Sequence, residues 1–532
     1  MKNFDTLGIM LDCSRNAVMK PESLKKFIDI TSKMGYNMIQ LYTEDTFEVD
    51  GEPYFGYMRG RYSKEELKEI DAYAQTKSIE LVPCVQTLAH FNAIVRWYGD
   101  IVDCNDILLV EEERTYQLIE NIFKTLSECF TSRRVNIGMD EAHMVGLGKY
   151  LDKHGYKNRF EILSEHLKKV CSIATKYGYK PAMWSDMFFR LATNGGYYTE
   201  NEELLKPVVP LVPEEVELIY WDYYSTEKTH YDNMMKAHKV FNNNLWFAGG
   251  CWSWRGFYPN NSFSFKAIDA SVESCLEYGI KNVFFTMWKD NGGECSFFSL
   301  LPSLMYAACK AQGIIEMSVI KSRFFEITGI AWDDMVKLDL PNDVGPNPLT
   351  TQNPSKYMLY NDLFMGMFDL TVHPDNKQHY DKYIPELKAL SSNPEYGYIF
   401  ESAYKHCEVL KIKFDLGLKT REYYQNKDIK ALKVLSGEYQ QLYNKVKDFY
   451  YAFRTLWEKE NKAHGFDVQD LRLGGLLMRI ENCKRRLDEF VSGKLDRIEE
   501  LEEKLLPFKN ETNNSNTIIF NNWTHSVTPN NI

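Results

Sequence analysis

The chain has 532 residues, which exceeds one typical domain and leaves room for a barrel of ~250 residues with at least one further domain. Its 63 lysines and arginines against 74 aspartates and glutamates give a formal charge of -11 without a basic run, so nucleic acid is not an expected partner. The 11 cysteines are scattered singly with no Cys-x-x-Cys pair, which predicts neither a disulfide framework nor a structural zinc site.

The N-terminal residues lead directly into a strand-like run. They contain no apolar stretch of signal-peptide length, and no later segment is apolar for long enough to span a membrane. Together with the unpaired cysteines, this pattern predicts a protein of the reducing cytoplasm that has no membrane partner.

From residue 7 to about 315, short apolar runs alternate with amphipathic helical stretches, which is the pattern of a parallel sheet covered by helices. Ser63 and Glu66 form a capping-box signature ahead of one helix, and Gly35 predicts the end of another. Eight runs favour a closed (β/α)8 TIM barrel over an open sheet, and no Gly-x-Gly-x-x-Gly follows the first. The runs are Gly8 to Leu11, Met38 to Tyr42, Glu80 to Pro83, Val135 to Gly138, Pro181 to Trp184, Glu217 to Trp221, Leu245 to Ala248 and Asn282 to Trp288.

Beyond the barrel the alternation ceases. We expect a catalytic barrel over 1–315, a connecting region over 316–399, and a mainly α-helical C-terminal domain over 400–532 with a terminal strand at Thr517 to Phe520. The helical domain could pack against the barrel or form a homodimer, and the sequence leaves both open. One of its stripes comprises Leu476, Leu477, Ile480, Cys483, Leu487 and Phe490.

The active site of a β/α barrel lies at the C-terminal ends of its strands. Carboxylates and tryptophans follow almost every predicted strand here, which suits a sugar ring with hydroxyl groups and apolar faces. Besides the Asp140-Glu141 pair, the candidates for substrate contact are Arg15, His90, Trp184, Trp221, Tyr223, Trp252, Trp254, Trp288, Asp290 and Glu294.

Metal binding is the main rival interpretation of these strand ends. Several of the side chains could be ligands, but no His-x-Glu or His-x-x-x-His spacing supports a site, so we predict no metal and no cofactor. The potential ligands are Glu44, Asp45, His90, Asp140, Glu141 and His143.

The Asp140-Glu141 pair is the sharpest feature. Consecutive side chains on a strand face opposite sides, so both carboxylates reach one sugar only if the chain bends as it leaves the barrel. Among indoles and beside a second carboxylate, Glu141 would stay protonated and could donate to a leaving oxygen. The alternative is an Asp140 that caps the next turn and a Glu141 on the surface.

At these residues the chain resembles glycoside hydrolase family 20, the exo-β-N-acetylhexosaminidases, and in particular the intracellular branch that begins directly with the catalytic barrel. The resemblance rests on an ordered set that spans residues 7 to about 315, and the helical tail is similar to that branch's C-terminal extension. The set comprises Gly60 and Tyr62, Pro83 to His90, Asp140-Glu141 after a glycine, Trp184, and Trp288-x-Asp290.

The resemblance implies a retaining, substrate-assisted mechanism in which the 2-acetamido oxygen attacks the anomeric carbon and forms an oxazolinium intermediate. Glu141 would be the general acid and base, and Asp140 would hold the acetamido group. By the same resemblance, Trp184, Trp221 and Trp288 wall the acetamido pocket, Tyr223 donates to its oxygen, and Asp290 or Glu294 accepts from sugar hydroxyls. The implied partner is a glycan with a terminal N-acetylhexosamine.

Two positions depart from the family. Its usual arginine before the first strand is Leu7 here, so Arg15 is the candidate for the hydroxyl clamp, and the usual acid four residues before His90 is Gln86. Two rival functions also remain: a glycosidase with Glu141 as acid and Glu44 or Asp290 as nucleophile, and a non-catalytic sugar-binding protein. The sequence does not distinguish GlcNAc from GalNAc.

Overall fold

The computed structural model describes residues 3–344, 353–508 and 519–532. Eight parallel strands close into one barrel in the order β1-β10-β9-β8-β7-β6-β3-β2, so the predicted fold class is confirmed, and each of the eight predicted runs supplies one strand. The strands are β1 (Thr6–Asp12), β2 (Met38–Tyr42), β3 (Glu80–Cys84), β6 (Arg134–Asn136), β7 (Lys180–Trp184), β8 (Glu217–Trp221), β9 (Leu245–Gly250) and β10 (Asn282–Met287).

The strands are apolar on both faces because one face fills the barrel and the other meets the helices. In β1, Ile9 and Leu11 pack in the outer core, whereas Met10 belongs to the inner cluster. At the C-terminal ends of the strands, this inner cluster includes Tyr42 and Trp184, and Trp221 and Trp288 pack against it. The interior of the barrel is therefore a packed core, and aromatic rings form its layer at the C-terminal ends of the strands.

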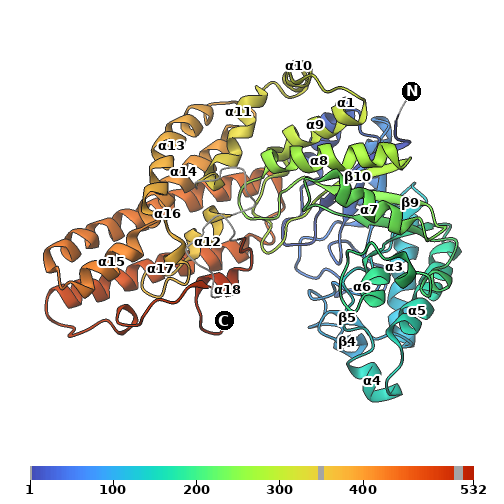
Figure 1. Ribbon diagram of the computed structural model, residues 1–532, viewed down its shortest axis with the longest axis horizontal. Coiled ribbons are helices and arrows are strands. Elements are labelled where there is room, and N and C mark those ends of the chain that lie inside the picture. Colours follow the sequence, from blue (N-terminus) through green and yellow to red (C-terminus); the bar gives the residue numbers. More distant parts are fainter. Residues whose placement is uncertain (1–2, 345–352, 509–518) are drawn as a thin grey trace.

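Helices surround the barrel and cover its outer core (Figure 1). Ser63 caps α2 in the predicted capping box with Glu66, and Gly35 ends α1. A small antiparallel pair, β4 (Val102–Cys104) and β5 (Ile107–Leu108), lies between β3 and α3. The helices of this part are α1 (Pro21–Met34), α2 (Lys64–Thr76), α3 (Glu113–Cys129), α4 (Lys149–His154), α5 (Arg159–Lys176), α6 (Asp186–Ala192), α7 (Lys228–His238), α8 (Asn261–Glu277) and α9 (Leu301–Ala311).

Most of the later helices form a second body to one side of the barrel (Figure 1), whereas α10 (Met317–Thr328) packs against α1 and α9. Within the second body α14 packs against α13 and α16, and α16 packs against α17. None of the described helices is long and apolar enough to cross a membrane. The helices are α10 (Met317–Thr328), α11 (Trp332–Val336), α12 (Pro354–Tyr360), α13 (Gln378–Leu390), α14 (Gly397–Lys413), α15 (Leu416–Gln425), α16 (Ile429–Glu460), α17 (Phe466–Val491) and α18 (Trp523–Val527).

The stripe predicted in this body lies on α17. Its members Leu476, Ile480, Cys483 and Leu487 are buried, and the other two pack partly buried against the same core. The strand predicted at 517–520 falls partly outside the described residues.

The helical body is joined closely to the barrel side. A backbone bridge pairs Met19 with Asn461, and the Lys20 amide donates to the carbonyl of Glu460 at 2.9 Å. The Lys462 ammonium in turn reaches Glu66 at 2.6 Å. These contacts hold the start of α17 beside the loop that follows β1.

Candidate active site

A pocket opens at the C-terminal end of the barrel, where the strand-end residues converge. It encloses about 480 Å³, counting the open solvent at its mouth. Ten of the twelve predicted site residues line it, and Tyr224 joins them without having been predicted. The lining consists of Arg15, His90, Asp140, Glu141, Trp184, Trp221, Tyr223, Tyr224, Trp254, Trp288 and Asp290.

The Asp140-Glu141 pair enters the pocket through a sharp turn. β6 ends at Asn136, and the backbone then takes positive φ at Gly138 (75°), Met139 (68°) and Glu141 (56°). This is the bend that an alternating strand requires before two consecutive side chains can share one pocket. Positive φ is costly for residues with a Cβ, so the surroundings must hold the turn in place.

Three side-chain oxygens hold this turn by accepting hydrogen bonds from its backbone amides. Asn136 accepts from the Gly138 amide at 3.0 Å, Gln86 accepts from Met139 at 3.1 Å, and Asp186 accepts from Glu141 at 3.1 Å. Because the acceptors come from three different strand ends, the barrel itself fixes the positions of the two carboxylates.

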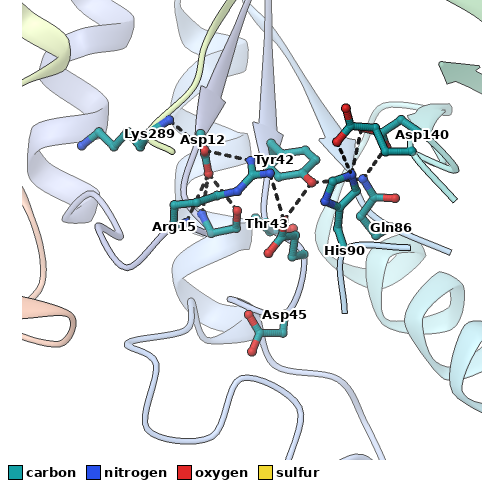
Figure 2. Close-up of polar contacts among 12 residues, drawn as sticks. Asp12, Arg15, Tyr42, Thr43, Asp45, Gln86, His90, Asp140 and Lys289 are labelled. Carbon is teal, nitrogen blue, oxygen red and sulfur yellow. Dashed lines mark hydrogen bonds and ion pairs between the residues drawn. The ribbon is translucent and has the colours of Figure 1, made fainter. Parts of the chain in front are cut away.

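Asp140 is held as a carboxylate. Gln86 donates to its Oδ1 at 2.7 Å, and His90 Nε2 lies 3.1 Å from its Oδ2 (Figure 2). Burial opposes ionisation, but the charge and hydrogen bond of His90, with that of Gln86, hold the pKa of Asp140 below its usual value. Burial would likewise lower the pKa of His90, yet Asp140 raises it to about 10. The pair is therefore an imidazolium beside a carboxylate near neutral pH.

Glu141 is the more open of the two acids, with 46% of its side chain exposed. Arg190 on α6 lies 3.9 Å from it and donates to Asp186 at 3.1 Å. Burial, together with the negative charge of Asp140, raises the pKa of Asp186 to about 7. A partly protonated acid thus lies directly behind the Glu141 backbone.

Arg15 provides the cation on the opposite side of the pocket. Its guanidinium lies 3.0 Å from Asp12 and beside the ring of Tyr42 (Figure 2). It also lies 3.5 Å from Glu44 and over the ring of Trp288. Leu7, at the position of the family's usual arginine, is buried within β1 instead.

Asp290 lines the pocket on the same side as Arg15. Burial raises the pKa of Asp290, and the charge of Arg15 acts against that shift. The two side chains together offer a donor fork and a carboxylate to hydroxyl groups.

Aromatic rings wall the remainder of the pocket. Trp221 stacks on Tyr223 with ring centroids 5.4 Å apart, and Trp184 lies 6.1 Å from Trp288. The indole N–H groups of Trp184 and Trp221 are buried without a hydrogen-bond partner among the described residues. Burial holds the pKa of Tyr223 far above its usual value, so its hydroxyl remains a donor. Such a wall presents flat apolar faces with unused donors.

Two predicted site residues lie outside the pocket lining. Trp252 is fully buried behind Trp254 and donates its indole N–H to the Tyr223 carbonyl at 2.8 Å. Glu294 is buried in ion pairs with Lys356 and Arg472. Trp252 thus supports Tyr223 and Trp254 from behind, whereas the partners of Glu294 lie on the helical body.

Sequence reasoning passed over several residues of the site. Gln86, Asp186 and Tyr224 stand at strand ends, and that position was the signal that could have identified them. Arg190, one turn into α6, carries no such signal. Among the described residues, no group of three or more His, Cys, Asp or Glu side chains could hold a metal ion.

Two family models match the chain: "Glycosyl hydrolase family 20, catalytic domain" over residues 4–240, and "Glycoside Hydrolase 20C C-terminal domain" over residues 331–520. A "Beta-hexosaminidase" of Akkermansia muciniphila is 22% identical over 233 residues, which are 37% of this chain and 46% of the relative. "Hexosaminidase D" of Bos taurus is 24% identical over 212 residues, which are 38% of this chain and 58% of the relative. The matches thus span about half the length of these relatives. A β-N-acetylhexosaminidase structure from Streptomyces coelicolor A3(2) aligns with 62% of this chain and 70% of its own, at 17% identity and a TM-score of 0.45.

Proposed function

Because the chain belongs to glycoside hydrolase family 20, we propose that it is a retaining exo-β-N-acetylhexosaminidase. It would remove terminal, non-reducing β-linked N-acetylglucosamine or N-acetylgalactosamine from a glycan. The observation that carries the proposal is the convergence of Asp140 and Glu141 in one pocket walled by indoles. The two carboxylates differ in environment, as a proton donor and a charge-stabilising carboxylate must.

In the first step, the substrate's own acetamido oxygen attacks the anomeric carbon and displaces the glycosidic oxygen. Glu141 donates its proton to that leaving oxygen. The half-exposed position of Glu141 supports this role, because the leaving group must also have a path out. The product of the step is a bicyclic oxazolinium ion that remains in the pocket.

Asp140 stabilises this ion. It accepts a hydrogen bond from the acetamido N–H and places a negative charge beside the positive charge that develops on the oxazolinium ring. The buried contacts from Gln86 and His90 support the role, since they fix the carboxylate before the substrate arrives. Preorganised charge of this kind costs no reorganisation during the reaction.

In the second step, Glu141, now ionised, takes a proton from a water molecule that attacks the anomeric carbon from the side of the departed group. The oxazolinium ring opens, and the acetamido group is restored. Because each step inverts the anomeric carbon, the sugar is released with retained configuration.

The rest of the pocket binds the sugar. Trp184, Trp221 and Trp288 would enclose the acetamido methyl, Tyr223 would donate to its oxygen, and Arg15 with Asp290 would bind ring hydroxyls. We place the enzyme in the reducing cytoplasm, since all 11 cysteines are unpaired and ten are buried.

The experiment is a panel of aryl glycosides given to the purified protein. The aryl N-acetylglucosaminide or N-acetylgalactosaminide should be hydrolysed, while the plain β-glucoside lacks the reacting oxygen and should lose more than the ~1–3 kcal/mol of a missing contact. Asp140→Asn should also lose turnover, because the amide brings no charge to the oxazolinium. An N-acetyl thiazoline should inhibit.

A glucoside cleaved within about tenfold of the N-acetylglucosaminide, a gap of ~1.4 kcal/mol, would contradict substrate assistance if Asp140→Asn also kept full turnover. Cleavage of that kind without thiazoline inhibition would favour a protein nucleophile such as Asp290. Tight sugar binding without release of any aryl group would indicate a binding protein.

A further inference from the structure

The segment from Trp288 to Glu294 leaves β10 through a turn in which several residues have left-handed backbone. Three consecutive residues have positive φ: Asn291 at 52°, Gly292 at 132° and Gly293 at 71°. Glycine takes positive φ without a steric cost and asparagine tolerates it better than most residues, so the sequence permits this conformation and the contacts around it select it. Trp288 and Asp290, immediately before it, line the pocket.

The contacts that select it come from the helical body. On α17, Gln469 donates to the Gly292 carbonyl at 2.9 Å, and Arg472 donates to the Asn291 carbonyl at 2.8 Å and to the Asn291 side chain at 2.9 Å. The Trp523 amide donates to the same Asn291 side chain at 3.1 Å. Residues far along the chain therefore provide the hydrogen bonds of a barrel loop.

A buried charge cluster completes this attachment. Glu294 binds Lys356 at 2.9 Å and Arg472 at 3.0 Å, and Lys356 also donates to the Asn291 carbonyl at 2.9 Å. The side chains of Glu294 and Lys356 are 1% and 0% exposed. Removing one partner of a buried ion pair leaves an uncompensated buried charge, so Glu294, Lys356 and Arg472 hold one another in place.

The loop packs closely between the helical body and the Arg15 segment. A Cβ on Gly292 would lie 2.4 Å from the Arg472 guanidinium, and one on Gly293 would lie 2.7 Å from the Arg15 carbonyl. Earlier in the loop, the Lys289 amide donates to Asp12 at 2.9 Å, and Asp12 also binds Arg15 (Figure 2). Asp12 thus links the loop that carries Asp290 to Arg15.

We propose that Gln469, Arg472 and Lys356 are positioning residues for the sugar-binding side of the pocket. They act through the Trp288 to Glu294 loop, so the helical body helps to position the residues that bind the sugar. The proposal rests on the proposed function for the identity of the substrate, while the geometry of the loop is independent of it. Glu294 acts here by anchoring the loop and not by touching the sugar.

The test compares two arginines of the same helix. Arg472 holds the loop, whereas Arg479, two turns later, binds Asp362 at 2.6 Å and 2.9 Å within the helical body. Arg472→Met should raise KM for the aryl N-acetylhexosaminide at least tenfold with a smaller change in kcat, since hydroxyl contacts are lost in ground and transition states alike. Arg479→Met should stay within twofold in both constants, and Arg472→Lys should recover part of the loss.

Amide hydrogen exchange, measured without substrate, reports how often the loop opens. The amides of Lys289 and Gly293 should exchange at least tenfold faster in Arg472→Met than in Arg479→Met. Gln469→Met removes one neutral hydrogen bond and should give the same pattern at smaller amplitude if Arg472→Met does not fold. A double-mutant cycle of Arg472→Met with Asp290→Asn should be non-additive.

Equal effects from the two arginine variants on exchange and KM would overturn the proposal, because they would indicate general loosening of the helical body. So would unchanged exchange and KM in Arg472→Met. A wild-type protein that cleaves no aryl N-acetylhexosaminide would refute the proposed function alone, and the exchange data would still decide whether Arg472 holds the loop.

Discussion

At the scale of single residues, Glu141 and Asp140 differ in how much their surroundings constrain them. Asp140 is enclosed by Gln86 and His90, whereas nearly half of the Glu141 side chain faces open space. A charge-stabilising group gains from being fixed, and a group that must exchange a proton with both a leaving group and water gains from access. The structure thus supports different roles for two adjacent carboxylates.

Glu141→Gln should remove most turnover of substrates with poor leaving groups, because these need the proton most, and spare activated aryl glycosides to a greater extent. The measurement is kcat for a series of aryl N-acetylhexosaminides ordered by the acidity of the released phenol. A small loss that is equal across the series would exclude Glu141 as the acid.

His90 should make stability depend on pH in the alkaline range. Its folded pKa of about 10 exceeds the ordinary value of 6.5, so its stabilising contribution is complete below 6.5 and is lost as pH rises through about 10. The difference in unfolding free energy between wild type and His90→Asn should therefore shrink steadily between pH 6.5 and 10, as measured by urea unfolding.

His238→Asn is the matched control for that experiment. Burial lowers the pKa of His238 to about 4, so this side chain is neutral across the alkaline range in both folded and unfolded chains. Its penalty should not change with pH there. A flat difference for His90→Asn as well would mean that His90 is not an imidazolium in the folded protein.

The residues of the site differ in how far the sequence could predict them. Asp140, Glu141 and the tryptophans follow apolar runs directly, so strand-end position predicts their placement. The role of Gln86 could not be predicted, because it depends on a side chain that accepts from one residue of the turn and donates to the next. Arg190 reaches the site only through the direction of α6.

At the scale of elements, β6 is shorter than predicted. The run Val135 to Gly138 predicts a strand through the glycine, but the strand ends at Asn136 because the chain turns there to present the two carboxylates. The small sheet of β4 and β5 was not predicted either, since strands of three and two residues leave no pattern of period two. Long amphipathic helices such as α3 and α17 follow their apolar stripes closely.

Gly138→Ala should damage both stability and activity. A Cβ there would lie 2.1 Å from the Gln86 side-chain oxygen at a φ of 75°, so we expect a loss of about 3 kcal/mol in unfolding free energy. Displaced Gln86 would also release Asp140, so activity should fall by more than the lost stability explains. Both are measured on one preparation, by denaturant unfolding and by aryl glycoside kinetics.

Gly329→Ala provides the control. This glycine ends α10 at a φ of 74° with nothing within 4 Å of its Cβ position, so the substitution should cost about 1 kcal/mol and leave kinetics unchanged. Equal costs at the two glycines would mean that the turn after β6 relaxes freely.

At the scale of the whole molecule, the barrel follows from the count of buried runs, whereas its attachment to the helical body does not. Nothing in the local sequence relates Asn291 to Arg472, because their contact depends on how two separately patterned regions dock. The arrangement of charges across that junction is therefore visible only in three dimensions.

The intact protein should need no added metal. Its proposed chemistry uses proton transfer and charge stabilisation by Asp140 and Glu141, and the described residues hold no cluster of ligands. Activity should survive dialysis against EDTA. A loss that a divalent ion restores would contradict this expectation, and a loss that only fresh protein restores would point to inactivation during dialysis.

The contact between α17 and the Asn291 loop joins residues that are synthesised far apart in time. A ribosome delivers Asp140 and Glu141 early, and the barrel strands are complete by Met287. The loop acquires its last partners only after Gln469, Arg472 and Trp523 have emerged. A nascent chain halted before α17 would contain both acids and all eight barrel strands. It would still lack the helix that holds the loop on the sugar-binding side. Catalytic maturity would then arrive late in translation, well after the barrel sequence itself has been made.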